Sequence, residues 1–141
     1  MTREEFVLAA MAPGAGHPYS PVQVQKLFFL LDRQIPRELR GPHFRFEPYH
    51  YGPFDIAVYY TLEQLAERGL VTIDCSRSPR TFALTAEGVE RGNRILNNLE
   101  AGTRDFIFRT CNFVRVQSFS SLVSAIYKAF PEMRANSVFQ S

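Results

Sequence analysis

Apolar residues recur at helical spacing along most of the chain. Residues 24–31 place them on more than one helical face, which predicts a helix buried on several sides. Residues 118–130 have a single apolar stripe that includes Phe119, and this spacing predicts an amphipathic helix ended by Pro131. Residues 104–116 suit either a buried helix or a strand, and we favour the helix. Further helices are expected over residues 4–11, 54–68 and 86–99.

Capping residues mark the ends of several of these helices. Ser20 followed by a proline is a strong helix start. The serine hydroxyl caps free N–H groups, and the N–H that proline lacks would have no partner in the first turn of a helix. Pro53 is expected as the first residue of the next helix, and Gly69 stands where a left-handed glycine would end it. Thr85 is expected to cap the following helix, and residues 101–103 to separate it from the next.

Short β-prone runs occur at residues 70–73 and 81–84, joined by a turn-type sequence. Residues 43–47 alternate apolar and polar side chains, which predicts a further short strand. The order helix, hairpin, helix resembles the winged-helix unit, and most winged helices are binding modules. We therefore expect a mainly α fold with a small β-hairpin, of the α+β class.

Length and composition favour one domain. The 141 residues, 45% of them hydrophobic, are enough to bury a substantial core. We expect a single domain over residues 1–141, with a winged-helix-like core over about 20–100 and a helical C-terminal extension over about 104–141. No apolar run approaches the ~20 residues that cross a bilayer, and no signal-type apolar block follows residues 1–5. The expected location is the cytoplasm.

None of the common catalytic or metal-binding motifs occurs in the sequence. It has no phosphate-binding glycine loop, dinucleotide fingerprint, serine-hydrolase elbow or H-E-x-x-H pair. A metal site built from His43, His50 and Asp55 would match no common spacing. Cys75 and Cys111 are isolated and are expected to be free thiols rather than a disulfide. We expect no enzyme activity, no metal and no cofactor, with an unrecognised active site as the minor alternative.

The net charge of +2 is too small to indicate nucleic-acid binding by itself. The basic residues are nonetheless unusual in kind, because all except Lys26 and Lys128 are arginine. Genome composition produces such a bias, and we favour that interpretation. The alternative is that arginine forks serve an acidic or phosphate-bearing partner, since each fork binds two oxygens at once.

Several tyrosines flank Pro53 and the expected helix beside it. Tyrosine is favoured at protein interfaces, because it buries a large area at little entropic cost and keeps a polar tip. The same helix has acidic positions. The main hypothesis is therefore a protein partner, bound by Tyr49, Tyr51, Tyr59, Tyr60, Glu63 and Glu67.

Nucleic acid is the alternative partner. In winged helices that bind DNA by the usual mode, the helix before the hairpin enters the major groove. In this chain that helix has more acidic than basic positions, which is unfavourable beside phosphates. The alternative function is a DNA-binding transcriptional regulator, dimeric through its C-terminal helices, that uses Arg77, Arg80, Arg91 and Arg94.

Two stretches resemble the Panacea domain of SocA-type antitoxins and the related YwgA-like proteins. Residues 24–31 are similar to the opening K-L-hydrophobic helix of that family, and residues 46–54 to its Y-G-P turn. Residues 119–138 look more like the YwgA side. The resemblance implies a mostly helical domain that acts by binding, often by neutralising a partner toxin. It implies an antitoxin or an accessory protein of a toxin–antitoxin, mobile-element or phage-defence system.

Overall fold

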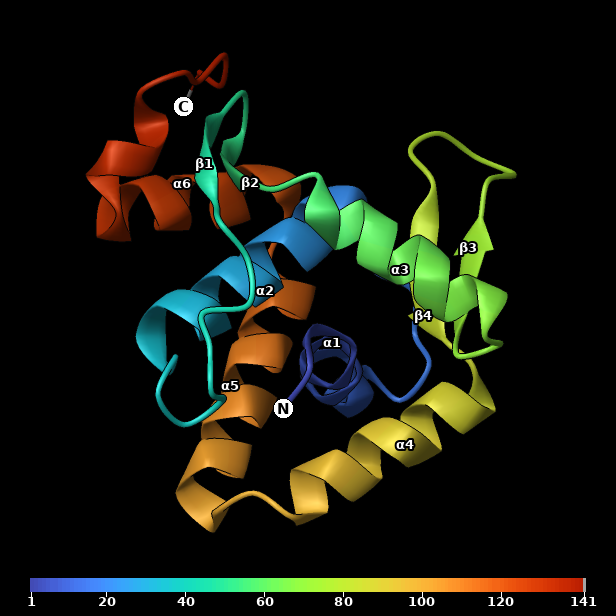
Figure 1. The fold of residues 1–141 in the computed structure, drawn as a ribbon. Coiled ribbons are helices and arrows are strands. Elements are labelled where there is room, and N and C mark those ends of the chain that lie inside the picture. The colour runs from blue at the N-terminus through green and yellow to red at the C-terminus, as the bar shows by residue number, and fades with distance from the viewer. Residues whose placement is uncertain (141) are drawn as a thin grey trace.

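A computed structural model describes residues 1–140 of the protein and contains, within them, six α-helices and two antiparallel hairpins (Figure 1). The helices are α1 (Arg3–Met11), α2 (Pro21–Gln34), α3 (Ala57–Glu67), α4 (Ala86–Asn97), α5 (Ala101–Val116) and α6 (Phe119–Ala129). The strands are β1 (Glu47–Tyr49), β2 (Gly52–Phe54), β3 (Val71–Asp74) and β4 (Thr81–Leu84). The expected mainly α fold with a small β component is confirmed.

Helix α1 lies in the middle of the fold, seen nearly end-on in Figure 1, and contacts α2, α3, α4 and α5. Every residue from Phe6 to Met11 is buried, because neighbours cover the helix on all sides. Its first turn begins with a capping box in which Thr2 and Glu5 bond each other's backbone N–H groups. The buried hydrophobic side chains of the six helices and of β3 and β4 form one cluster.

Tyr19, between α1 and α2, pairs with the β4 residue Phe82 through backbone N···O distances of 2.7 and 2.9 Å. The resulting order is a helix, a bridging extended residue, two helices and a hairpin, which is the winged-helix order. One part departs from it. A helix-turn-helix joins its two helices by a turn of about 3–4 residues, whereas residues 35–56 separate α2 from α3.

The start and stop signals at Ser20, Thr85 and Gly69 are confirmed. Ser20 and Gln23 form a capping box at the start of α2, and the Thr85 hydroxyl accepts the Gly88 N–H at the start of α4. Gly69, after α3, has a positive φ of 75°, the left-handed conformation that glycine adopts without strain.

The helix expected over residues 54–68, with Pro53 as its first residue, is wrong at its start. Pro53 lies in β2, opposite Pro48 of β1, and α3 begins only at Ala57. Asp55 separates the two elements, since its carboxylate accepts the Ala57 N–H at 2.9 Å. Both strands lie at a sheet edge, where prolines are tolerated because no ladder donor is needed.

The strand expected over residues 43–47 is also wrong in place. The backbone N–H groups of His43 and Phe44 donate to the buried Asp32 carboxylate, at 2.7 to 2.9 Å, and not to another strand. Strand pairing therefore starts only at Glu47.

The C-terminal helices follow the sequence prediction except at two points. Residues 104–116 are helical, but residues 101–103 belong to the same helix, because the Arg104 N–H already bonds the Glu100 carbonyl. The interruption lies at residues 98–100. Phe119, expected inward, is 46% exposed, because it is the first residue of α6 and lies beside the β1–β2 hairpin.

Helix α4 packs closely on α1 because Gly92 lies at the contact, and Gly88 gives it a similarly close approach to Leu70. A Cβ built on Gly92 would lie 2.5 Å from the Leu8 carbonyl oxygen and 2.7 Å from Ala12 Cβ. A Cβ on Gly88, one turn earlier, would overlap the Leu70 carbonyl. The obstructing atoms are mainly backbone, so they cannot move aside as a flexible side chain would.

Gly92→Ala is expected to lower the free energy of unfolding by about 2 kcal/mol or more, because overpacking outweighs the better helix propensity of alanine. Gly102→Ala is the matched control: it lies in α5 with open space around it, so it should be neutral or stabilising by up to ~1 kcal/mol. Denaturant unfolding of both variants measures the difference. Equal stabilities would contradict the close α1–α4 contact.

Candidate partner-binding site around Lys26

The β1–β2 hairpin projects next to α2 and α6 (Figure 1). Its strands pair Tyr49 with Gly52, so His50 and Tyr51 form the two-residue loop. Gly52 has a backbone φ of 103°, which residues with a side chain rarely adopt. This tight turn therefore requires glycine. The loop presents the Tyr51 ring to solvent.

Helix α2 holds the hairpin from one side through buried polar side chains. The Gln25 amide bonds the backbone of Asp55 twice, donating to its carbonyl and accepting its N–H, both at 3.0 Å. Lys26 Nζ donates to the Pro53 carbonyl at 3.2 Å. These bonds fix the end of β2 relative to α2, because buried polar groups are costly to leave without a partner.

The C-terminal segment holds the other side of the hairpin. The Val138 N–H donates to the His50 carbonyl at 2.9 Å, and Asn136 Nδ2 donates to the Pro48 carbonyl at 3.2 Å. The Tyr127 hydroxyl of α6 donates to Ser137 Oγ at 2.7 Å. The hairpin is thus held between α2 and residues 136–138 in the absence of a partner.

Aromatic rings cover this part of the molecule, and we call Tyr49, Tyr51, Phe54, Tyr59 and Phe119 the aromatic face. Ring centroids lie 4.9 Å apart for Tyr49 and Phe54, 5.7 Å for Phe54 and Tyr59, and 5.1 Å for Tyr51 and Phe119. Tyr49 is 47% exposed and Tyr51 42% exposed. Large exposed rings in a group are typical of interaction sites.

A cavity of about 250 Å³ opens among these rings, and we call it the Lys26 pocket. Lys26 is only 3% exposed, and burial lowers the pKa of its amine from the ordinary 10.5 to about 7. Within the described part of the chain, no carboxylate side chain lines the cavity. Its lining consists of Pro21, Val22, Gln25, Lys26, Tyr49, His50, Tyr51, Gly52, Phe54 and Tyr59.

Tyr59 connects this pocket to the β3–β4 hairpin. Burial raises the pKa of its hydroxyl, and its ring stacks on Phe82 at 5.8 Å. The Arg80 guanidinium lies 5.2 Å from the Tyr59 ring centroid and 3.3 Å from the Glu63 carboxylate. Arg80 and Glu63, expected on two different interfaces, therefore bind each other.

The structure brings three of the six expected partner-binding residues to one place. Tyr49, Tyr51 and Tyr59 all line the Lys26 pocket. Tyr60 and Glu67 are exposed on α3 and do not line this pocket.

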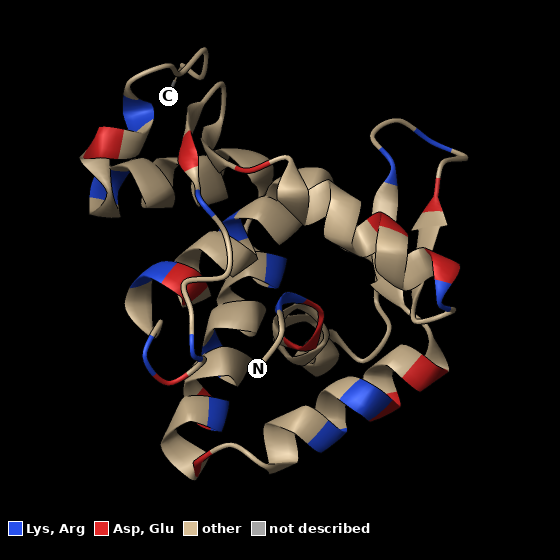
Figure 2. Ribbon diagram, in the orientation of Figure 1, with Lys and Arg blue, Asp and Glu red and all other residues tan. Residues whose placement is uncertain are grey.

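The expected nucleic-acid residues on α4 are paired with acids of the same helix. Arg91 lies 3.3 Å from Glu87, and Arg94 lies 2.5 Å from Glu90. Figure 2 shows basic and acidic positions interspersed along this helix. Each pair satisfies its arginine locally, so α4 presents no row of unopposed positive charge.

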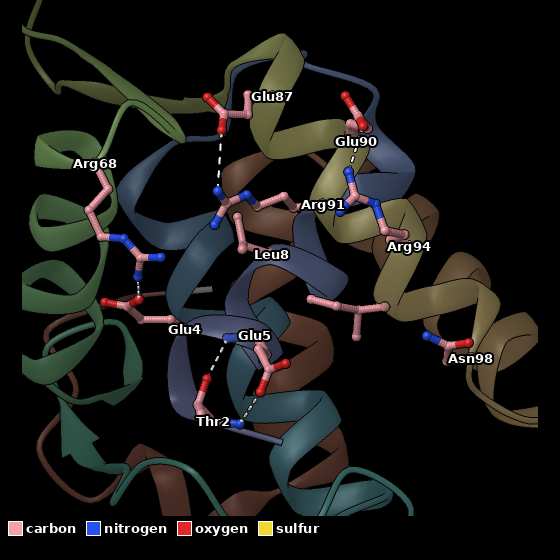
Figure 3. A pocket seen from close by; sticks show the side chains of 11 residues that line it. Thr2, Glu4, Glu5, Leu8, Arg68, Glu87, Glu90, Arg91, Arg94 and Asn98 are labelled. Atoms are coloured by element: carbon pink, nitrogen blue, oxygen red, sulfur yellow. Dashed lines mark hydrogen bonds and ion pairs between the residues drawn. The ribbon is translucent and has the colours of Figure 1, made fainter.

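A larger groove of about 660 Å³ lies between α1, the end of α3 and α4 (Figure 3). Arg68 reaches across it to pair with Glu4, while Arg91 points over Leu8. Its lining includes more acidic than basic side chains, namely Glu4, Glu5, Glu87 and Glu90 against Arg68, Arg91 and Arg94. An anion would have to displace existing ion pairs there, which disfavours a phosphate site.

The residues weighed as metal ligands serve other purposes. The His43 ring bonds the Leu39 carbonyl, the His50 ring stacks on Tyr49, and the Asp55 carboxylate accepts N–H groups of Arg45 and Ala57. Among residues 1–140, no group of three His, Cys, Asp or Glu side chains is placed to hold a metal ion.

The sequence analysis missed Lys26, Phe54 and Phe119 as residues of the site. Lys26 lies within the apolar run of residues 24–31, and a lone lysine on a helix expected to be buried on several sides was the signal for it. Phe119 had no comparable signal, because its helical spacing is the same as that of a core residue.

Comparison with known proteins identifies no relative: the chain matches no protein-family model, no curated protein and no solved structure. The resemblance to the Panacea domain stays a prediction. In the part of the chain that the structure describes, no helix has both the length and the apolar character needed to cross a membrane.

Lys26→Met is expected to remove part of the pH dependence of stability. Between about pH 7 and pH 10.5 the unfolded chain holds a proton on Lys26 that the folded protein has released, so the free energy of unfolding rises with pH. From pH 6 to pH 9 this rise amounts to roughly 2–3 kcal/mol. It should be present in the native sequence and absent in Lys26→Met.

Denaturant unfolding at pH 6 and pH 9 measures this effect. Lys128→Met is the matched control, because Lys128 is exposed and should keep the full rise. An unchanged rise in Lys26→Met would show that the buried amine stays protonated in the folded protein.

Proposed function

We propose that this protein is a non-catalytic protein-interaction module whose partner binds the aromatic face. The observation that supports this proposal is the pair of exposed rings Tyr49 and Tyr51 at the Lys26 pocket, on a hairpin held from two sides, with exposed Phe119 of α6 against Tyr51. A rigid group of rings loses little entropy on binding and buries a large area. Hot spots at interfaces are enriched in tyrosine for the same reason.

Charge supports a protein partner over nucleic acid. Arg91 and Arg94 on α4 pair with acids one turn away, and so does Arg109 on α5, which lies 3.1 Å from Asp105. The aromatic face itself consists of apolar rings, three of which end in a tyrosine hydroxyl. Such a surface suits contact with another protein. The narrower role, an antitoxin or accessory protein of a toxin–antitoxin, mobile-element or phage-defence system in the cytoplasm, depends on the motif resemblance alone.

Tyr49→Ser with Tyr51→Ser is expected to abolish capture of a stoichiometric protein partner from native lysate treated with nuclease. Both side chains are exposed, so the fold should be retained, which circular dichroism checks. Phe108→Ser is the matched control: its ring is exposed on α5, outside the Lys26 pocket, and its removal should leave capture unchanged. Equal capture by the double variant and the native protein would exclude the aromatic face.

A DNA-binding regulator is the second candidate function. The winged-helix order and the exposed Arg77 in the β3–β4 turn favour it. The long segment between α2 and α3 and the acidic positions Glu63 and Glu67 on α3 oppose it.

If the regulator hypothesis holds, Arg77→Ala should weaken binding to mixed-sequence duplex DNA and reduce its salt slope by about one charge. Fluorescence anisotropy at several salt concentrations measures this slope. We expect instead no appreciable affinity at low salt, and that result would dismiss the regulator.

A further inference from the structure

The amine of Lys26 is incompletely satisfied within the described residues. An ammonium group has three N–H donors, and the Pro53 carbonyl, at 3.2 Å, is the hydrogen-bond acceptor that the folded chain provides. Among residues 1–140 no carboxylate compensates its charge, and burial lowers its pKa. A buried cation without an acid is costly, so an anion that enters the cavity gains an interaction which the free protein lacks.

The walls of the Lys26 pocket require an apolar group next to that anion. Tyr49, Phe54 and Tyr59 provide ring surface, and Gly52 places no side chain beside the amine, where a Cβ would lie 3.6 Å from Nζ. The titratable side chains that line the pocket besides Lys26 are His50, Tyr49, Tyr51 and Tyr59. None of these described lining residues is a carboxylate, so none of them repels an incoming acid.

We propose that the Lys26 pocket binds the C-terminal residue of the partner protein, with its apolar side chain against the aromatic rings and its α-carboxylate on Lys26. This inference rests on the proposed function and names the chemistry of the partner. A cavity of about 250 Å³ suits one residue rather than an extended ligand. A chain end combines an anion and an apolar side chain on neighbouring atoms, as the pocket demands.

Other anions fit the cavity less well. A nucleic-acid phosphate is attached to polar sugars. The rings would remove water from these sugars without offering hydrogen bonds in exchange. An aspartate or glutamate side chain offers the carboxylate but little apolar surface. Capture of a terminal carboxylate is a recurring mode of peptide recognition.

The two lysines make a direct test possible on the native protein. With ¹³Cε-labelled lysine, NMR reports Lys26 and Lys128 as separate signals, and exposed Lys128 is the internal control. The probes are acetyl-Leu-Phe with a free carboxylate, its C-terminal amide, and acetyl-Leu-Glu amide, which has only a side-chain carboxylate. The free acid is expected to shift the Lys26 titration upward by more than one pH unit and to leave Lys128 unchanged.

The uncharged amide should produce no such shift, and acetyl-Leu-Glu amide should bind at least tenfold more weakly than the free acid. Equal binding of acid and amide, equal responses of both lysines, or no response to the acid would overturn the inference. Preference for the Glu side chain would overturn it as well, because the anion would then not be a chain end.

The variant Lys26→Met separates this inference from the proposed function. Its affinity for the free-acid probe should fall at least tenfold, whereas Lys128→Met should bind as the native protein does. If partner capture needs Tyr49 and Tyr51 but the probe never binds, the aromatic face stands and the carboxylate inference fails. If the probe binds through Lys26 but the tyrosine variant captures its partner normally, the proposed face fails instead.

Discussion

Buried polar side chains on α2 are the constraint on which the rest of this structure depends. Gln25, Lys26 and Asp32 lie on the side of α2 that faces residues 35–56, and each bonds the backbone of that segment. Because buried polar groups are strongly disfavoured without partners, these bonds determine where the segment lies. The β1–β2 hairpin and the start of α3 take their positions from them.

The same constraint produces the chemistry of the candidate site. The lysine that anchors β2 is left with a desolvated amine in a cavity lined by rings, and the tail residues close the hairpin from the opposite side. A surface prepared in this way binds without first ordering itself, which reduces the entropy cost of association. Burial of this amine lowers the free energy of unfolding; the loss is largest below about pH 7 and declines as the pH rises toward 10.5.

Arginine, the dominant basic residue, has mainly local roles in this fold. Arg91, Arg94 and Arg109 bind acids one helical turn away, and Arg80 lies against Tyr59 and Phe82. Such exposed pairs add little to stability individually. They do neutralise surfaces that would otherwise attract phosphates, and recognition is therefore left to the aromatic face.

The sequence by itself determined the helices and the β3–β4 hairpin, because Ser20, Gly69 and Thr85 act on their own neighbours within a few residues. It also indicated Tyr49 and Tyr51 by residue type. Tertiary structure alone decided the pairing of β1 with β2, the burial of Lys26 and the exposure of Phe119. Those outcomes depend on hydrogen bonds and packing between α2, the hairpin and the C-terminal segment, which are far apart in the chain and invisible to local periodicity.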